Sequence, residues 1–191
     1  RKVERLTKTA RFRYSAVMEN IDYTHDRNID RNQIQRFATC DFITQKDNIL
    51  ITGSTGAGKS YMASAIGHQA CSLGFKTMYF NTSKLFTMLK TSKADGSYLK
   101  QVNKIEKQDL LILDDFGLKG LDNINRHSLM EIIEDRHGKK STIIASQLPV
   151  EAWHEIIGEQ TIADAILDRL VHTAHRIDIK GESMRKKLKN K

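Results

Sequence analysis

The apolar residues of this chain fall into short runs that are separated by longer amphipathic stretches. Runs typical of buried strands occur at 49–52, 77–80, 109–115, 141–146 and 176–179. Between these runs, apolar residues recur at helical spacing, as Ile124, Leu129, Ile132 and Ile133 do within 123–138. Strands that alternate with helices predict an α/β fold, in which helices cover both faces of a parallel sheet.

The two ends of the chain lack this alternation. Residues 3–20 have a basic, helical pattern, and 31–37 have the pattern of a short helix just before the first strand. Gly and Pro are absent from the first 52 residues, so this segment is expected to pack as an arm and not to act as a flexible linker. Residues 182–189 predict a terminal basic helix. The expected division is an arm at 1–38, a core at 39–180 and a short C-terminal segment at 181–191.

A glycine-rich loop follows the first predicted strand. The sequence GSTGAGKS, residues 53–60, has the spacing G-x-x-x-x-G-K-[ST] of a Walker A loop, which binds nucleotide phosphates. Its backbone N–H groups can surround a phosphate chain at the N-terminus of the next helix. Lys59 is expected to reach the β- and γ-phosphates, and the Ser60 hydroxyl to bind Mg²⁺. The expected ATP-binding residues here are Gly53, Ser54, Thr55, Gly56, Ala57, Gly58, Lys59, Ser60 and Tyr61.

A second phosphate-site motif ends the third apolar run. In LLILDD, two carboxylates, Asp114 and Asp115, follow a strand, which is a Walker B pattern. If both motifs belong to one sheet, Asp114 can support the Mg²⁺ ion held by Ser60. Asp115 stands where many ATPases have a glutamate that orients the attacking water. Because aspartate is one methylene shorter, hydrolysis is expected to be slow, and the nucleotide to act more as a switch than as continuous fuel.

Charge is distributed unevenly along the 191 residues. The formal net charge is +8, yet residues 1–13 and 180–191 each hold six Lys/Arg and one Glu, so the ends alone carry +10. A polar stretch at 91–107, expected to be a loop and a short helix, adds a local group of lysines. Such clusters indicate a polyanion partner, most simply nucleic acid, although a solvated face would have the same composition. The candidate DNA-binding residues are Lys84, Lys90, Lys93, Lys100 and Lys104.

No run of apolar residues reaches transmembrane length, and the start RKVERLTKTARFR lacks the apolar stretch of a signal peptide. The sequence therefore predicts a cytoplasmic protein without a membrane partner. Cys40 and Cys71, the two cysteines, are too few for a disulfide framework or a metal site.

Five motifs occur in an order that resembles one ATPase family. GSTGAGKS, LLILDDFG, EDRHGKKSTIIASQLP, DAILDRL and KGESMRKK together are similar to AAA+ ATPases of the DnaC/IstB branch, and most to IstB-like transposition helper ATPases. The resemblance extends roughly from Phe12 to Lys187. It implies an AAA+ fold, ATP and Mg²⁺ as cofactors, and a homo-oligomer that forms with nucleotide. It also implies duplex DNA and a transposase as partners.

The resemblance also implies roles for particular residues. Gln147 matches the sensor 1 position, although Asn is commoner there and Ser146 is a rival. Arg169 matches the arginine finger that acts on a neighbouring subunit's nucleotide, and Arg185 matches the sensor 2 arginine. Ile29 lies in the arm that borders the adenine in such proteins. Few residues follow the last predicted strand, so the helical lid of larger AAA+ proteins must be much reduced.

These observations predict an ATPase that assembles on duplex DNA and helps a transposase select or remodel its target. A replicative helicase loader, which acts on single-stranded DNA, shares all the motifs and remains an alternative. A small-molecule kinase also has a Walker A loop, but it would need neither a neighbour's arginine nor DNA. A scaffold that hardly hydrolyses its nucleotide is a further possibility.

Overall fold

The computed structural model describes residues 1–189. Within them, five strands form one parallel sheet in the order β2-β3-β4-β1-β5. The strands are β1 (Asn48–Gly53), β2 (Thr77–Asn81), β3 (Leu110–Asp114), β4 (Ser141–Ser146) and β5 (Ala174–Ile179). The Walker A strand β1 and the Walker B strand β3 thus belong to one sheet, as expected, and β4 lies between them. Because all the strands run in parallel, both motifs lie at the same edge of the sheet.

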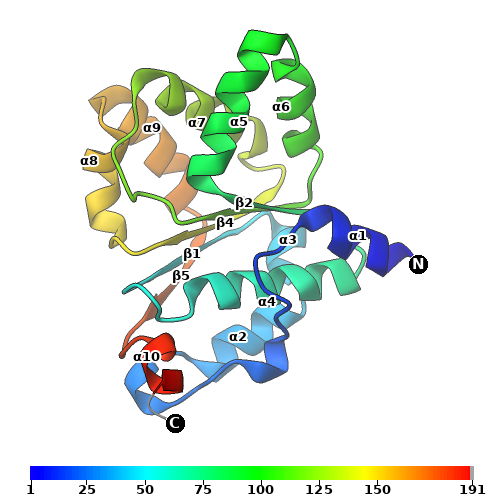
Figure 1. The fold of residues 1–191 in the computed structure, drawn as a ribbon, viewed down its shortest axis with the longest axis vertical. Coiled ribbons are helices and arrows are strands. Elements are labelled where there is room, and N and C mark those ends of the chain that lie inside the picture. The colour runs from blue at the N-terminus through cyan, green and yellow to red at the C-terminus, as the bar shows by residue number, and fades with distance from the viewer. Residues whose placement is uncertain (190–191) are drawn as a thin grey trace.

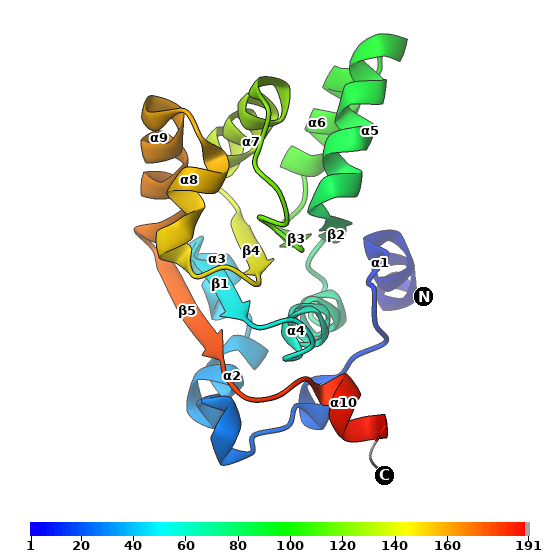
Figure 2. The same cartoon turned by 60° about the vertical axis from the view of Figure 1, so that its left-hand side comes forward.

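Helices cover both faces of this sheet, which confirms the predicted α/β architecture (Figure 1). On one face, α2 (Arg31–Ala38), α3 (Asp41–Gln45) and α4 (Lys59–Ser72) pack with the N-terminal arm. On the other face lie α5 (Thr82–Asp95), α6 (Tyr98–Glu106), α7 (Asn123–Arg136), α8 (Trp153–Ile157) and α9 (Gln160–Val171). Figure 2 shows the two layers on either side of the strands.

The sheet residues alternate between the two cores. Ile49 and Ile51 of β1 face the core beside α4, whereas Leu50 faces the core beside α7 and α9. Each of the three is fully buried. A strand buried on both faces has a continuous apolar sequence, which is why these runs were recognisable as strands.

The N-terminal arm differs from the predicted helix at 3–20. Helix α1 (Lys2–Ala10) ends at Arg11, whose φ of 60° is left-handed, and the chain then runs without a helix to a short 3₁₀ turn at 18–20. The Phe12 ring stacks on His68 of α4, with the ring centroids 4.4 Å apart. A Cβ atom on Gly67 would lie only 2.4 Å from the Phe12 ring, so the glycine allows this close approach. Packing against α4 has overridden the helical pattern of the arm.

The stretch at 91–107 also differs from the prediction. Helix α5 extends into it as far as Asp95 and ends where Gly96 takes a left-handed φ of 80°. The side chain of Asn81 caps the start of α5 by accepting a hydrogen bond from the backbone N–H of Lys84 at 3.2 Å. The stretch expected to be a loop and a short helix is therefore part of a hairpin of two helices, α5 and α6. The terminal helix α10 is Met184–Lys189, and none of the helices within 1–189 has the length and apolar character needed to cross a bilayer.

A buried arginine, Arg136 of α7, links this helix to α6 and to β4. Arg136, 1% exposed, donates hydrogen bonds to the carbonyl oxygens of Ile105 (3.0 Å) and Gln108 (2.9 Å). It also donates to the Ser141 carbonyl and to the hydroxyl of Thr142 at 3.1 Å. The guanidinium thus ties α7 to α6 and β4, and its burial is compensated by acceptors from α6, from Gln108 and from β4.

Arg136→Met should therefore lower the free energy of unfolding by about 3 kcal/mol, because it leaves several buried carbonyl groups without a donor. Urea denaturation followed by circular dichroism measures this change. Arg176→Ala is the matched control, because the Arg176 side chain is 49% exposed and forms an ion pair with the exposed Glu151. The control should change stability by about 0.5 kcal/mol or less. An equally small effect at Arg136 would contradict its structural role.

Candidate functional site

The Walker A loop joins β1 to α4 and adopts the geometry that its glycines permit. Gly56 and Gly58 have left-handed φ angles of 82° and 97°. A Cβ atom on Gly58 would lie 2.7 Å from the Arg27 guanidinium, so a larger residue has no room there. Lys59 begins α4, and its Nζ donates to the Ser54 carbonyl at 2.8 Å. Burial lowers the pKa of Lys59, while the nearby Asp114 and Asp115 carboxylates act in the opposite direction.

A cavity of about 600 Å³ opens beside this loop. Segments that are far apart in the sequence line it: the arm, the Walker A loop with the start of α4, the residues that follow β3 and β4, and the start of α10. Lining residues with polar or charged side chains include Arg13, Asp22, Arg27, Thr55, Lys59, Ser60, Tyr61, Asp115, Gln147 and Arg185. A cavity of this size, with convergent cationic groups on a phosphate-binding loop, suits a nucleotide.

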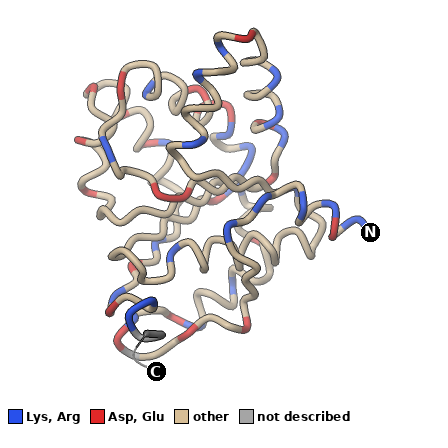
Figure 3. The backbone as a smooth tube through the Cα atoms, in the orientation of Figure 1, with Lys and Arg blue, Asp and Glu red and all other residues tan. Residues whose placement is uncertain are grey.

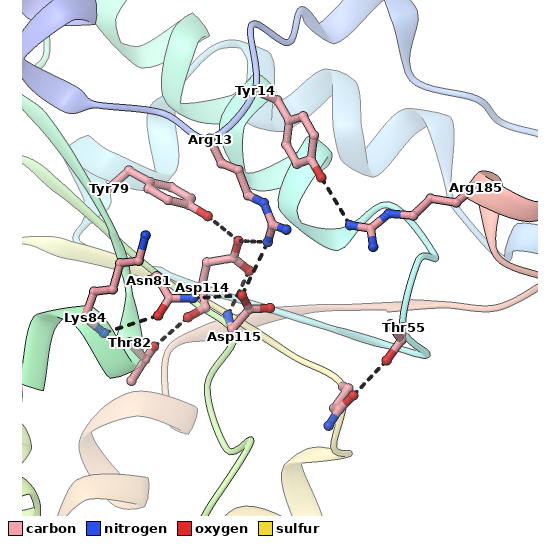
Figure 4. A network of polar contacts seen from close by, with 11 residues as sticks. Arg13, Tyr14, Thr55, Tyr79, Asn81, Thr82, Lys84, Asp114, Asp115 and Arg185 are labelled. Atoms are coloured by element: carbon pink, nitrogen blue, oxygen red, sulfur yellow. Dashed lines mark hydrogen bonds and ion pairs between the residues drawn. The ribbon is translucent and has the colours of Figure 1, made fainter. Parts of the chain in front are cut away.

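The Walker B carboxylates lie at the end of β3 in one network of polar contacts (Figure 4). Asp114 is fully buried and accepts a hydrogen bond from the Tyr79 hydroxyl. Burial and this contact raise the pKa of Tyr79, so the tyrosine is a fixed donor. Asp115 has a left-handed φ of 55°, a strained geometry for a residue other than glycine. Its Oδ2 accepts from Asn81 at 2.9 Å and from Arg13 at 3.3 Å.

Gln147 and Ser146 occupy different environments at the end of β4. Gln147 is exposed to the cavity, and its Oε1 accepts a hydrogen bond from the Thr55 hydroxyl at 2.8 Å. The buried Ser146 hydroxyl instead donates to the Phe116 carbonyl at 2.6 Å and accepts from the Leu148 N–H at 3.1 Å. The geometry therefore favours Gln147 over Ser146 as the residue that faces the nucleotide.

The C-terminal segment closes onto the Walker A loop. The N–H of Met184 donates to the Gly56 carbonyl at 2.9 Å, and the N–H of Lys180 donates to the Arg27 carbonyl at 3.0 Å. Arg185 lines the cavity, and its Nη2 donates to the Tyr14 hydroxyl at 3.5 Å. Arg185 is thus close to the phosphate-binding loop of its own chain, which a sensor 2 role requires.

Ile29 does not line the cavity. It packs against the core beside α4, and the arm contributes Asn20, Ile21 and Asp22 to the cavity instead. The reason is that the chain turns between these residues and Ile29, where Arg27 is buried and donates to the Ala57 carbonyl. Within the arm, residues 20–22 rather than Ile29 therefore line the cavity.

Arg169 lies away from this cavity, in the last turn of α9. Its carbonyl faces Asn48, which begins β1, whereas the Walker A loop follows the end of that strand. The guanidinium donates to the Ala165 carbonyl at 3.0 Å and lies 3.8 Å from Glu134. Within its own chain, Arg169 is therefore at the opposite end of the sheet from the phosphates.

The candidate DNA-binding lysines are divided between two environments on the α5–α6 hairpin. Lys90 pairs with Asp122 at 2.6 Å, and the ammonium of Lys93 lies 4.7 Å from the centre of the Tyr98 ring. Lys84, Lys100 and Lys104 are exposed and form no ion pair within the described part of the chain. Figure 3 shows further basic positions on α1 and α10, in separate regions of the molecule.

Sequence reasoning missed several residues of the site. Arg13 was counted only as one of the basic residues of 1–13 and Arg27 was not singled out, yet both line the cavity. Asn81 and Tyr79 of β2 contact the Walker B carboxylates, because β2 pairs with β3 and Asn81 is in register with Asp114. The one available signal was a polar residue at the end of a buried strand beside the Walker B strand. For Arg27 the sequence had no signal.

Comparisons with known proteins agree with this geometry. The family described as IstB-like ATP binding protein matches residues 1–191. The insertion sequence ATP-binding protein y4pL of Sinorhizobium fredii (strain NBRC 101917 / NGR234) is 47% identical over 191 residues, which are 100% of this chain and 78% of that protein.

Solved structures share the fold at lower identity. The DnaI crystal structure has a TM-score of 0.73 and 21% identity, covering 93% of this chain and 94% of DnaI. The DnaC helicase loader has a TM-score of 0.68 and 22% identity, covering 87% of this chain and 98% of the loader. With the Walker A and Walker B residues at one edge of the sheet, the chain belongs to the IstB-like ATP-binding proteins and is an AAA+ ATPase.

Proposed function

We propose that this ATPase assembles on duplex DNA when ATP is bound and helps a transposase select or remodel its target. The observation that carries the proposal is the placement of Arg169. A family member with a Walker A and Walker B site has its candidate arginine finger at the far end of the sheet, which only a neighbouring copy could bring to the phosphates. Nucleotide binding would then be coupled to assembly.

Mg²⁺ is proposed as the metal that accompanies ATP. Ser60 supplies a hydroxyl in the cavity, and Asp114 supplies a buried carboxylate at the end of β3. Oxygen donors of these types suit a small, hard cation, and Tyr79 fixes the Asp114 carboxylate from the side of β2. The metal would neutralise charge on the phosphates. Lys59 would bind the β- and γ-phosphates, and Asp115 and Gln147 would hold the attacking water.

The transposase partnership is supported by the name of a close relative, because y4pL is described as an insertion sequence protein. DNA binding is supported by charge: Lys84, Lys100 and Lys104 are exposed cations on one helical hairpin. Contacts of this kind bind phosphates with little base readout. Oligomerisation would bring the separate basic regions of successive subunits into one track.

The helicase loader is the nearest alternative, because the DnaC loader shares the fold. The two functions require different nucleic acids. Proteins that bind single strands usually stack bases on aromatic side chains, and Tyr98 is the one aromatic residue of α6. Its hydroxyl donates a hydrogen bond to Glu131 at 2.5 Å, and the Lys93 ammonium lies over its ring. The face of the ring that Lys93 covers is therefore not open to a base. The kinase alternative loses its support with the family assignment.

Fluorescence anisotropy with a long duplex should show cooperative binding that the ATP analogue AMPPNP strengthens at least tenfold over ADP. Affinity should fall steeply with salt, and matched single-stranded DNA should bind more weakly. Replacing Lys100 and Lys104 by Ala should weaken duplex binding and reduce its salt dependence, whereas Lys139→Ala, in the turn that follows α7, is the control. Preference for single strands would support the loader instead, and absence of DNA binding in every nucleotide state would refute both.

A further inference from the structure

A cation from the arm reaches the catalytic end of the nucleotide cavity. Arg13 Nη1 lies 3.3 Å from Asp115 Oδ2 and 3.9 Å from Asp114 Oδ2. Its side chain lines the same cavity as Lys59 and Ser60. We infer that Arg13 is a ligand for the terminal phosphate of ATP, supplied by the chain itself, and that it lets the protein distinguish ATP from ADP. This inference rests on the ATP site and is independent of the proposed DNA binding.

The backbone around Arg13 is fixed to the helix that carries the phosphate-binding loop. On one side, Phe12 packs on His68 and Gly67 of α4. On the other side, the carbonyl of Tyr14 lies 3.3 Å from His68 Nε2, and the Tyr14 ring is 6.2 Å from that of Tyr61. The Arg13 backbone is thus held against α4 from both sides. Its guanidinium can change partners by side-chain rotation alone, without movement of the arm.

The Arg13 guanidinium has N–H groups that make no hydrogen bond within the described residues. Nη1 makes its one hydrogen bond, to Asp115, and within the described part of the chain Nε and Nη2 have no acceptor. The side chain is 40% exposed although two carboxylates lie beside it. A guanidinium presents five N–H groups in a planar fork that matches two phosphate oxygens. One edge of this fork is therefore available to an anion in the cavity.

Charge decides which anion this is. Asp115 lines the cavity directly after the Walker B strand, beside the buried Asp114, and this end of the cavity would receive the γ-phosphate. A divalent cation on Asp114 would repel the Arg13 guanidinium, because its Nη1 lies 3.9 Å from Asp114 Oδ2. Asp115 keeps a second donor, Asn81 at 2.9 Å, when Arg13 withdraws. The terminal phosphate is then the strongest anion within reach of Arg13, and ADP does not have it.

Isothermal titration calorimetry with Mg²⁺ tests this inference by comparing AMPPNP with ADP. Arg13→Ala should weaken AMPPNP binding roughly tenfold to a hundredfold, the loss expected for a charged hydrogen bond, and ADP binding less than about twofold. Arg13→Lys keeps the charge without the fork and should lie between Arg13→Ala and the wild type. Lys8→Ala, which removes an exposed basic residue from α1, is the matched control and should leave both affinities unchanged.

Three results would overturn the inference. Equal losses for AMPPNP and ADP would mean that Arg13 only holds the arm, and unchanged affinities would mean that it has no role in binding. Tighter AMPPNP binding would mean that Arg13 merely competes with the metal for Asp114 and Asp115. Failure of AMPPNP to promote DNA binding would refute the proposed function and leave this inference standing.

Discussion

Lys59→Ala is expected to lower the affinity for ATP by about a hundredfold or more and to abolish measurable hydrolysis. Lys59 is buried at the start of α4, and among the described residues its ammonium donates to the Ser54 carbonyl of the same loop alone. It is thus held in position beside the phosphate-binding backbone. Its removal deletes a charge-assisted hydrogen bond to the phosphates, and the surrounding burial prevents water from replacing it fully. Calorimetry gives the affinity, and phosphate release gives the rate.

The same variant tests whether nucleotide controls assembly. Lys139→Ala removes an exposed lysine near the end of α7 and should change neither ATP binding nor hydrolysis. If Lys59→Ala lost ATP binding but still formed oligomers and bound duplex DNA as the wild type does, nucleotide would not be the switch. If its ATP affinity were unchanged, the phosphates would bind elsewhere than in the Walker A loop.

The parts of the fold that could be predicted from the sequence are those that depend on local pattern. Strands such as β1 are buried on both faces, so their apolar residues are continuous along the sequence and easy to recognise. The Walker loop could be recognised because its glycines meet a local requirement, the left-handed φ at Gly56 and Gly58. Asp114 and Asp115 followed from their position at the end of a strand.

The missed parts depend on contacts between distant segments. Arg13 reaches Asp115, 102 residues along the chain, and Arg27 reaches the Ala57 carbonyl, 30 residues away. In the sequence, nothing distinguishes Arg13 and Arg27 from the other basic residues of the arm. The break of the predicted helix after Ala10 has the same origin, because Phe12 and Tyr14 gain more from packing on α4 than from continuing α1. The charge counted over residues 1–13 therefore includes Arg13, whose side chain lines the cavity.

Arg169→Ala is expected to leave ATP affinity within about threefold of the wild type and to lower the hydrolysis rate at least a hundredfold. Arg169 does not touch the cavity of its own chain, so its loss should not disturb binding there. If a neighbour's Arg169 stabilises charge on the phosphoryl group in the transition state, only the rate should fall. Glu134→Gln removes the local partner of Arg169 without touching the arginine, and it should retain hydrolysis and thus exclude a merely structural effect.

A mixture of two inactive variants separates action across subunits from action within one. Asp115→Asn keeps Arg169 but loses the carboxylate expected to orient water, and Arg169→Ala keeps Asp115. Where the two variants meet in an oligomer, one of the two possible orders joins an intact Asp115 to an intact Arg169. Random mixing in equal amounts should then restore about a quarter of the wild-type rate, because about a quarter of the heterologous interfaces have that order. No recovery would mean that Arg169 does not act on the nucleotide of a neighbouring subunit. Its position at the far end of the sheet would then need another explanation.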